Sequence, residues 1–323
     1  MLRKLCLAVL LVLFAMPANA AKIVMNCNAI YGPTNFHTLG AINYAKLVKD
    51  YTDGSVDITV HPGGSLGFKG PELLKSVKDG TLPMSDILMG VVAGSEEIFG
   101  ISTMPLMVGS YPEAKKFYDI ARPYYAKACE RWNQKLLYAA PWPRSGLFTK
   151  KPVKSMADIA GLKTRTYDKN GAEFLKRAGA NPQSLPWGEV YSALSTGLID
   201  SVLTSATSGA EGKFWEVLNH FTKINYSYPL NMLTINMDYW KALDEDQREA
   251  MLRAAVEVEA AQWLASKASI ETSLAAISKH GMIISEKTAG LAAELDAVAK
   301  AMREEFKAHA KQDSKDVLTA FGK

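Results

Sequence analysis

"GLKTRTYDKNG" (residues 161–171) places a short strand pattern directly before a helix start. Arg165 stands near the end of the strand, and Asp168 can start a helix that continues to about residue 178. In open α/β sheets, ligands bind outside the carboxyl ends of strands, and a guanidinium is a planar fork that matches a carboxylate. The stretch predicts a βα unit and leaves two roles for Arg165: an anion site, or an ion pair with Asp168 or Glu189.

The same alternation runs along most of the chain. Strand patterns are predicted at 22–30, 55–62, 85–91, 135–142, 198–205 and 230–237. Helix patterns are predicted at 35–49, 71–79, 111–132 and 188–197. Parallel strands need crossover helices between them, so the alternation predicts an α/β fold with largely parallel sheets.

The last third of the sequence is helical in character. Asp244 and Gln247 form a variant of the capping box, and neither proline nor glycine follows until after His280. A helix of roughly 35 residues is about 50 Å long, which exceeds the width of one small domain. We therefore expect it to lie across two lobes, with a final helix at 288–310.

The first twenty residues have the pattern of a secretory signal peptide. Arg3 and Lys4 precede an apolar run too short for a membrane anchor, and residues 18–20 read Ala-Asn-Ala. We expect cleavage after Ala20 and an exported chain that is not embedded in a membrane. The net charge falls from +4 to +2 without Arg3 and Lys4, and no basic tract remains, which argues against nucleic acid as a partner.

Two cysteines remain in the mature chain, Cys27 and Cys129. Export permits a disulfide between them. Two separate buried thiols are the alternative, because one lies in a predicted strand and the other in a predicted helix.

One block of sequence resembles a known family. "SMADIAGLKTRTYD" (155–168) with "LPWGEVYSALSTGLID" (185–200) resembles the solute-binding subunit of tripartite ATP-independent periplasmic (TRAP) transporters. "HPGGSLG" (61–67) and "LLKSVKDGTLPMSDI" (73–87) are similar to the family's loop, helix and strand before that block.

The resemblance covers nearly the whole mature chain. It implies a two-lobed α/β protein of the periplasmic-binding type, with crossing strands and the long helix spanning both lobes. It implies that the lobes close on an organic acid, which is delivered to membrane permease subunits with no chemical step and no cofactor. The implied lobes are 21–143 plus 231–270, and 144–230 plus 271–323.

The resemblance also implies ligand-binding residues. Arg165 would form a bidentate salt bridge with the ligand carboxylate, and Arg144 is the candidate for a second arginine, although it lies one residue farther off than expected. Thr204 occupies the polar position four residues after Asp200, and Ser201 stands where glycine is usual. These departures predict a ligand unlike the sugar acids.

Aromatic residues are candidates for the walls of the site, and for each one core packing is the commoner role. They are Tyr31, Phe36, Trp142, Tyr167, Trp187 and Trp215. Such walls predict an aromatic or apolar monocarboxylate. Glu72 and His37 are further candidates, with a solvated helix face and a capping or core histidine as their alternatives.

Other functions have weaker support. The chain lacks H-x-x-x-H, C-x-x-C and EF-hand spacing, so no protein-built metal site is predicted. "GGSLG" (63–67) fits the nucleophile elbow of a secreted serine hydrolase, with Ser65 as nucleophile and His220 or His280 as base. His61 and Pro62 interrupt the required turn, and no oxyanion segment occurs. A binding protein that serves a sensor instead of a transporter fits the same sequence.

Overall fold

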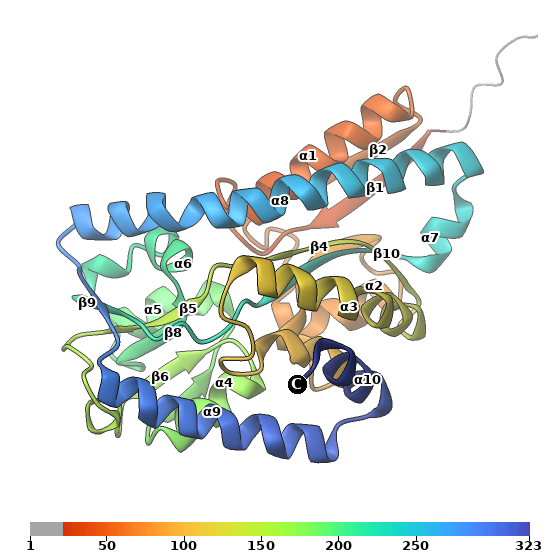
Figure 1. Cartoon of the computed structure of the whole chain (residues 1–323). Coiled ribbons are helices and arrows are strands. Elements are labelled where there is room, and N and C mark those ends of the chain that lie inside the picture. The colour runs from red at the N-terminus through yellow and green to blue at the C-terminus, as the bar shows by residue number, and fades with distance from the viewer. Residues whose placement is uncertain (1–21) are drawn as a thin grey trace, which may run out of the picture.

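The computed structural model describes residues 22–323, so the predicted signal peptide and its cleavage after Ala20 lie outside the described part. Two sheets, each covered by helices, form two lobes side by side (Figure 1). The expected α/β fold with two lobes is confirmed.

The first lobe is built on a five-stranded sheet. Its strand order is β2 (Val56–His61), β1 (Ile23–Asn28), β3 (Met84–Leu88), β10 (Leu230–Asn236) and β4 (Gln134–Pro141). β1 pairs in parallel with β2 and β3, whereas β10 is antiparallel to β3 and β4. The helices of this part of the chain are α1 (Phe36–Tyr51), α2 (Leu73–Lys78), α3 (Tyr111–Arg131) and α7 (Met237–Ala242).

The second lobe is built on a six-stranded sheet. Its strand order is β11 (Ile283–Glu286), β9 (His220–Lys223), β5 (Ser145–Thr149), β8 (Ser201–Ser205), β6 (Lys163–Thr166) and β7 (Asn181–Ser184). β6 is parallel to β7 and β8, as the βα alternation predicts, and β5 is antiparallel to its neighbours. The helices are α4 (Lys169–Arg177), α5 (Val190–Ser195), α6 (Ala206–Glu211) and α9 (Ala289–His309).

Several segments of residues 22–323 join the lobes. Residues 142–144 carry the chain from β4 to β5, and residues 224–229 carry it back from β9 to β10. The predicted long helix is α8 (Glu245–Lys279), with the capping box of Asp244 and Gln247 at its start. It packs on α1 and β4 in the first lobe and on α6 in the second, so it spans both (Figure 1).

The C-terminal helix α10 (Gln312–Phe321) belongs with the first lobe. The ring of Phe321 lies 4.9 Å from that of Phe117 on α3, and Val317 and Leu318 are part of the same core. Asp313 pairs with Lys127 and Arg131 of α3. The family resemblance implied that residues 271–323 lie in the second lobe. The position of α10 differs because its apolar face is complementary to α3, a tertiary contact that local sequence does not encode.

Both cysteines are free thiols in separate cores, Cys27 among the residues around α1 and Cys129 among those around α3.

Within residues 22–323, no helix combines the length and the apolar character needed to cross a membrane.

Candidate functional site

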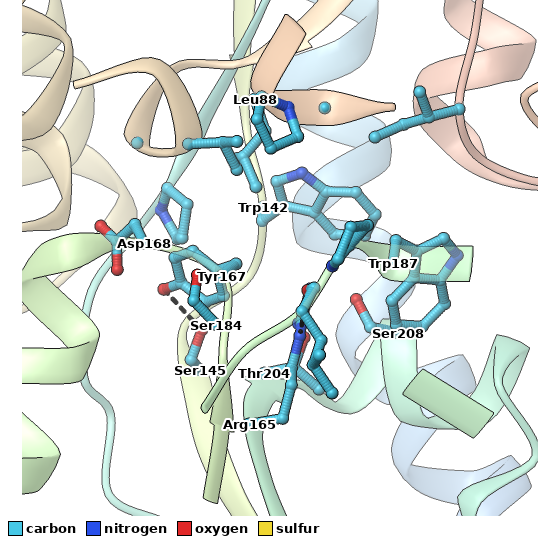
Figure 2. A pocket seen from close by; sticks show the side chains of 18 of the residues that line it. Leu88, Trp142, Ser145, Arg165, Tyr167, Asp168, Ser184, Trp187, Thr204 and Ser208 are labelled. Atoms are coloured by element: carbon cyan, nitrogen blue, oxygen red, sulfur yellow. Dashed lines mark hydrogen bonds between the residues drawn. The ribbon is translucent and has the colours of Figure 1, made fainter. Parts of the chain in front are cut away.

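A cavity of about 450 Å³ lies between the two lobes. The first lobe contributes Leu88 at the end of β3, Gly90 and Val91 after it, and Trp142 from the crossing segment. The second lobe contributes Arg165 and Tyr167 from the end of β6, Thr204 from β8 and Trp187 from the loop after β7. Figure 2 shows these side chains converging, with Leu88 and Trp142 above Arg165 and Trp187 to one side.

Arg165 reaches the cavity because it lies at the carboxyl end of β6. Nε and Nη2 of its guanidinium donate hydrogen bonds of 3.0 and 2.9 Å to the carbonyl oxygen of Leu185. Leu185 follows β7, which pairs in parallel with β6 and so fixes this carbonyl beside the guanidinium. Two hydrogen bonds to one acceptor orient the planar group and leave Nη1 to donate to a ligand.

In the part of the chain that the structure describes, the charge of Arg165 has no counter-ion. The residue is only 4% exposed, and within residues 22–323 no carboxylate lies within 4.0 Å of its nitrogens. Burial lowers the pKa of Arg165 to about 10, which still leaves it charged at neutral pH. A buried, unpaired cation is unfavourable unless an anion compensates it. The surroundings of Arg165 are therefore those of an anion-binding site.

A chain of hydrogen bonds holds the opposite wall. Trp142 Nε1 donates to Asn231 Oδ1 at 2.7 Å, and Asn231 Nδ2 donates to both carboxylate oxygens of Asp86 at 3.0 Å. Burial raises the pKa of Asp86 to about 7. Tyr31 packs edge-on against Trp142, with ring centroids 4.9 Å apart. Because Asn231 and Asp86 lie on β10 and β3, the sheet of the first lobe fixes the indole.

Polar groups that the sequence analysis did not single out also line the cavity. Among them are Ser145, Ser184 and Ser208. Tyr167 and Ser145 are linked through their hydroxyl groups at 3.2 Å, shown as a dashed line in Figure 2. A serine carries no sequence signal of its own, and these serines come together only through the packing of β5, β7 and α6.

The two carboxylate oxygens of Asp168 have different surroundings. Oδ1 accepts a hydrogen bond from the backbone N–H of Gly171 at 2.8 Å and so caps α4, as the sequence predicted for the helix start. Oδ2 is buried without a hydrogen-bond partner among the described residues. Burial raises the pKa of Asp168 to about 6, against the opposing influence of Arg165. Asp168 forms no salt bridge with Arg165, so the ion pair considered from the sequence does not neutralise the arginine.

The predicted wall residue Phe36 and the further candidate His37 lie behind the cavity. The rings of Phe36 and His37 lie 5.1 and 4.6 Å from that of Trp142, and neither residue lines the cavity. His37 is 3% exposed, and burial lowers its pKa to about 3. Both support the indole from behind, so His37 takes the role of a core histidine.

Three other predicted residues lie elsewhere. Glu72 is exposed and accepts a hydrogen bond from the backbone N–H of Lys69 at 2.6 Å, as the cap of a short turn. Trp215 stacks on His280, with ring centroids 4.1 Å apart, away from the cavity. Arg144 donates to the carbonyl oxygen of Gly109 at 3.0 Å and lines a different pocket. These three positions correct the expectation that all the candidates converge on one site.

The fold does not bring the residues of the proposed serine hydrolase together. Ser65 is exposed in the loop after β2 of the first lobe. His220 lies on β9 and His280 follows α8 in the second lobe, where its Nδ1 lies 2.8 Å from the carbonyl oxygen of Ala276.

Residues 22–323 contain no group of three His, Cys, Asp or Glu side chains placed to hold a metal ion.

Polar contacts join the two lobes, and we call three of them the interlobe clasp. Asn35 Nδ2 donates to the carboxylate of Glu211 at 2.7 and 2.8 Å, and Lys69 pairs with Glu189 at 2.5 Å. The third contact joins Asn170 Nδ2 to the carbonyl oxygen of Gly100 at 2.9 Å and to Thr103 Oγ1 at 3.0 Å. The structure is therefore in a closed conformation.

Comparison with known proteins agrees with this architecture. The family described as bacterial extracellular solute-binding protein, family 7, matches residues 28–313. A solute-binding protein of Albidiferax ferrireducens is 28% identical over 223 residues, which span 67% of this chain and 65% of that relative.

Two solved structures are similar over nearly their full length. One is a Bordetella pertussis extracytoplasmic solute receptor binding pyroglutamic acid, with 27% identity, a TM-score of 0.91, and coverage of 93% of this chain and 99% of that one. The other is a TRAP solute-binding protein from a marine metagenome, specific for pyroglutamate and solved with co-purified pyroglutamate. It has 30% identity, a TM-score of 0.90 and the same coverage.

Proposed function

Because this chain belongs to the bacterial extracellular solute-binding proteins of family 7, the receptors of TRAP transporters, we propose that it captures one small organic monocarboxylate. The lobes close over the ligand, and the closed form delivers it to membrane permease subunits. The proposed place of action is the periplasm, reached by cleavage of the signal peptide after Ala20.

The observation that carries the proposal is the unpaired charge of Arg165. The cavity holds this one buried guanidinium, and its free N–H groups can take both oxygens of a carboxylate. The other cation that lines the cavity, Lys169, is exposed, so a second carboxylate on the ligand would find no second buried cation. A monocarboxylate is therefore the best match to the charge of the site.

Pyroglutamate is the first ligand to test. Its carboxylate would pair with Arg165, its ring would lie between Trp142 and Trp187, and its lactam N–H and C=O would meet the polar groups of the cavity. Two similar structures, at 27% and 30% identity, are named for pyroglutamate, which supports the choice. An aromatic or apolar monocarboxylate is the competing ligand class, because most of the lining is apolar.

Thermal unfolding of the mature protein against a panel of acids tests the proposal. The protein is first denatured and refolded to remove bound ligand, and the extract is analysed by mass spectrometry. We expect pyroglutamate to stabilise more than phenylacetate, glucuronate or succinate. At a hundred times its dissociation constant, a ligand adds about 2.7 kcal/mol, a shift of several degrees. An extract without any carboxylate, together with no shift from any acid, would contradict the proposal.

A further inference from the structure

A second pocket lies on the other side of the segments that join the lobes. It has a volume of about 420 Å³, and we call it the rear pocket. Trp142 and Ser145 face the ligand cavity, whereas Arg144 and Gly146 line the rear pocket. The two cavities therefore share the same stretch of chain as a wall, one in front of it and one behind.

The rear pocket draws its walls from both lobes. The first lobe contributes Ser110 and Tyr111 at the start of α3, and β9 of the second lobe contributes Phe221 and Lys223. The spanning helix α8 contributes Lys267. A molecule that touches all of these walls would be sensitive to the angle between the lobes.

The charges in this pocket are unbalanced. It is lined by three cations, Arg144, Lys223 and Lys267, and by one acid, Glu286. Lys223 Nζ pairs with Glu286 at 2.9 Å. In the part of the chain that the structure describes, the half-buried Arg144 and the exposed Lys267 have no carboxylate within 4.0 Å, which leaves two positive charges without a protein counter-ion.

Arg144 is held in place without being neutralised. Its Nη1 donates to the carbonyl oxygen of Gly109 at 3.0 Å, and its guanidinium carbon lies 5.5 Å from the ring centre of Tyr228. The nearby Glu113 accepts a hydrogen bond from the N–H of Gly109 at 2.7 Å, where it compensates the positive end of α3. The remaining N–H groups of Arg144 are thus pre-oriented and available to an anion.

The other walls are apolar or aromatic. Phe221, Tyr228, Ile270 and Leu274 line the pocket between the cations. A pocket with two uncompensated cations and apolar walls fits an anion with a short carbon skeleton better than an inorganic ion. We propose that the rear pocket is a second binding site for a small organic dicarboxylate, held by Arg144 and Lys267.

Binding in the rear pocket is coupled to the front cavity. The pocket is formed in a conformation whose interlobe clasp is closed, so an anion that fits it stabilises the closed form. Stabilising the closed form raises the affinity of the front site, and linkage requires the reverse effect to be equal. Only this coupling rests on the proposed function; binding of a dicarboxylate in the rear pocket does not.

The first experiment uses the Arg165→Met variant, in which the front site has lost its cation. Succinate is compared with sodium chloride at equal ionic strength by thermal unfolding, and inorganic phosphate is the comparator. We expect succinate to raise the melting temperature of this variant and phosphate to raise it less. The rise should vanish when Arg144→Gln and Lys267→Gln are added. It should persist when the exposed Lys150 and Lys176 are changed to Gln instead.

The second experiment measures coupling in the otherwise wild-type protein by calorimetry. Saturating succinate should raise the affinity for pyroglutamate severalfold, and Arg144→Gln with Lys267→Gln should remove that rise. No stabilisation of the Arg165→Met variant by succinate would overturn the rear site. Stabilisation that survives the loss of Arg144 and Lys267, or equal stabilisation by phosphate, would overturn it as well. A rear site without the rise in pyroglutamate affinity would overturn the coupling.

Discussion

Replacing Arg165 by methionine removes the guanidinium but keeps most of the side-chain volume. Arg165 is 4% exposed and is the one buried cation that lines the cavity within residues 22–323, so a ligand carboxylate would lose it as a partner. Truncating one partner of a buried charge pair costs about 2–5 kcal/mol, or roughly thirtyfold to several thousandfold in affinity. We expect calorimetry to show a loss of pyroglutamate binding within this range or beyond.

The stability of the ligand-free protein should change far less. In the ligand-free protein the open form is favoured and water solvates the guanidinium, so methionine chiefly removes the hydrogen bonds to the Leu185 carbonyl. A hydrogen bond contributes about 1 kcal/mol net, so unfolding by urea should shift by about 1 kcal/mol. The affinity of Arg165→Lys for pyroglutamate should lie between those of the wild type and Arg165→Met. An ammonium group keeps the charge but cannot form two parallel hydrogen bonds to a carboxylate.

Lys176→Gln is the matched control, since it removes a positive charge from the surface of the same lobe. It should leave the affinity unchanged. If Arg165→Met binds pyroglutamate within about threefold of the wild type, or if Lys176→Gln weakens binding as much, the assignment of Arg165 as the anchor is refuted.

Three further predictions concern the interlobe clasp, the ionisation of the buried Asp168 and the wall of the cavity formed by Trp187. Glu211→Ala should weaken ligand binding roughly tenfold in calorimetry, because buried Asn35 loses a charged acceptor; Glu189→Ala, which breaks an exposed pair, should change affinity less than about twofold. Burial raises the pKa of Asp168 to about 6 from 3.8, so its ionised form disfavours the folded state. That penalty is absent below about pH 4 and complete above pH 6, so urea unfolding should show Asp168→Asn stabilising the protein more at pH 8 than at pH 4; an equal effect at both values would contradict it. Trp187→Ala should lower affinity by about tenfold or more through loss of an apolar wall, with a smaller effect on unfolding because the indole is only half-buried.

The fold was predictable where the pattern of the sequence was long or strongly periodic. The helix α8 was identified with its cap, because thirty-five residues without proline or glycine have few alternatives. The short strands β5, β7, β9 and β11 were not predicted. β7 has four residues, includes Pro182, and exists because it pairs with β6 along the edge of the sheet. Pairing of this kind depends on the neighbouring strand and leaves no local period.

The site was predictable for Arg165 because its position follows from a general rule about strand ends. The side on which Arg144 lies could not be predicted in the same way. In a regular strand Trp142 and Arg144 would share a face, but residues 142–144 lie between β4 and β5 and include Pro143. The break reverses the alternation, so Trp142 and Ser145 face the ligand cavity and Arg144 faces the rear pocket.

The unpaired charge of Arg165 also explains why closure should depend on the ligand. In an open form water solvates the guanidinium, whereas in the closed form described here it is 4% exposed and has no counter-ion among residues 22–323. Burying such a charge costs several kcal/mol. Of the contacts in the clasp, Lys69 with Glu189 is exposed and worth about 1 kcal/mol or less.

Without ligand, the cost of burying Arg165 therefore exceeds much of what the clasp contributes, and the open form is favoured. A carboxylate at Arg165 removes that cost. About 5.5 kcal/mol is needed to turn a 1:99 population into 99:1, and neutralising a buried cation is of this size. The ligand-free Arg165→Met variant should therefore be more compact than the ligand-free wild type in small-angle X-ray scattering, although it no longer binds. An equally open variant would show that the charge of Arg165 does not hold the lobes apart.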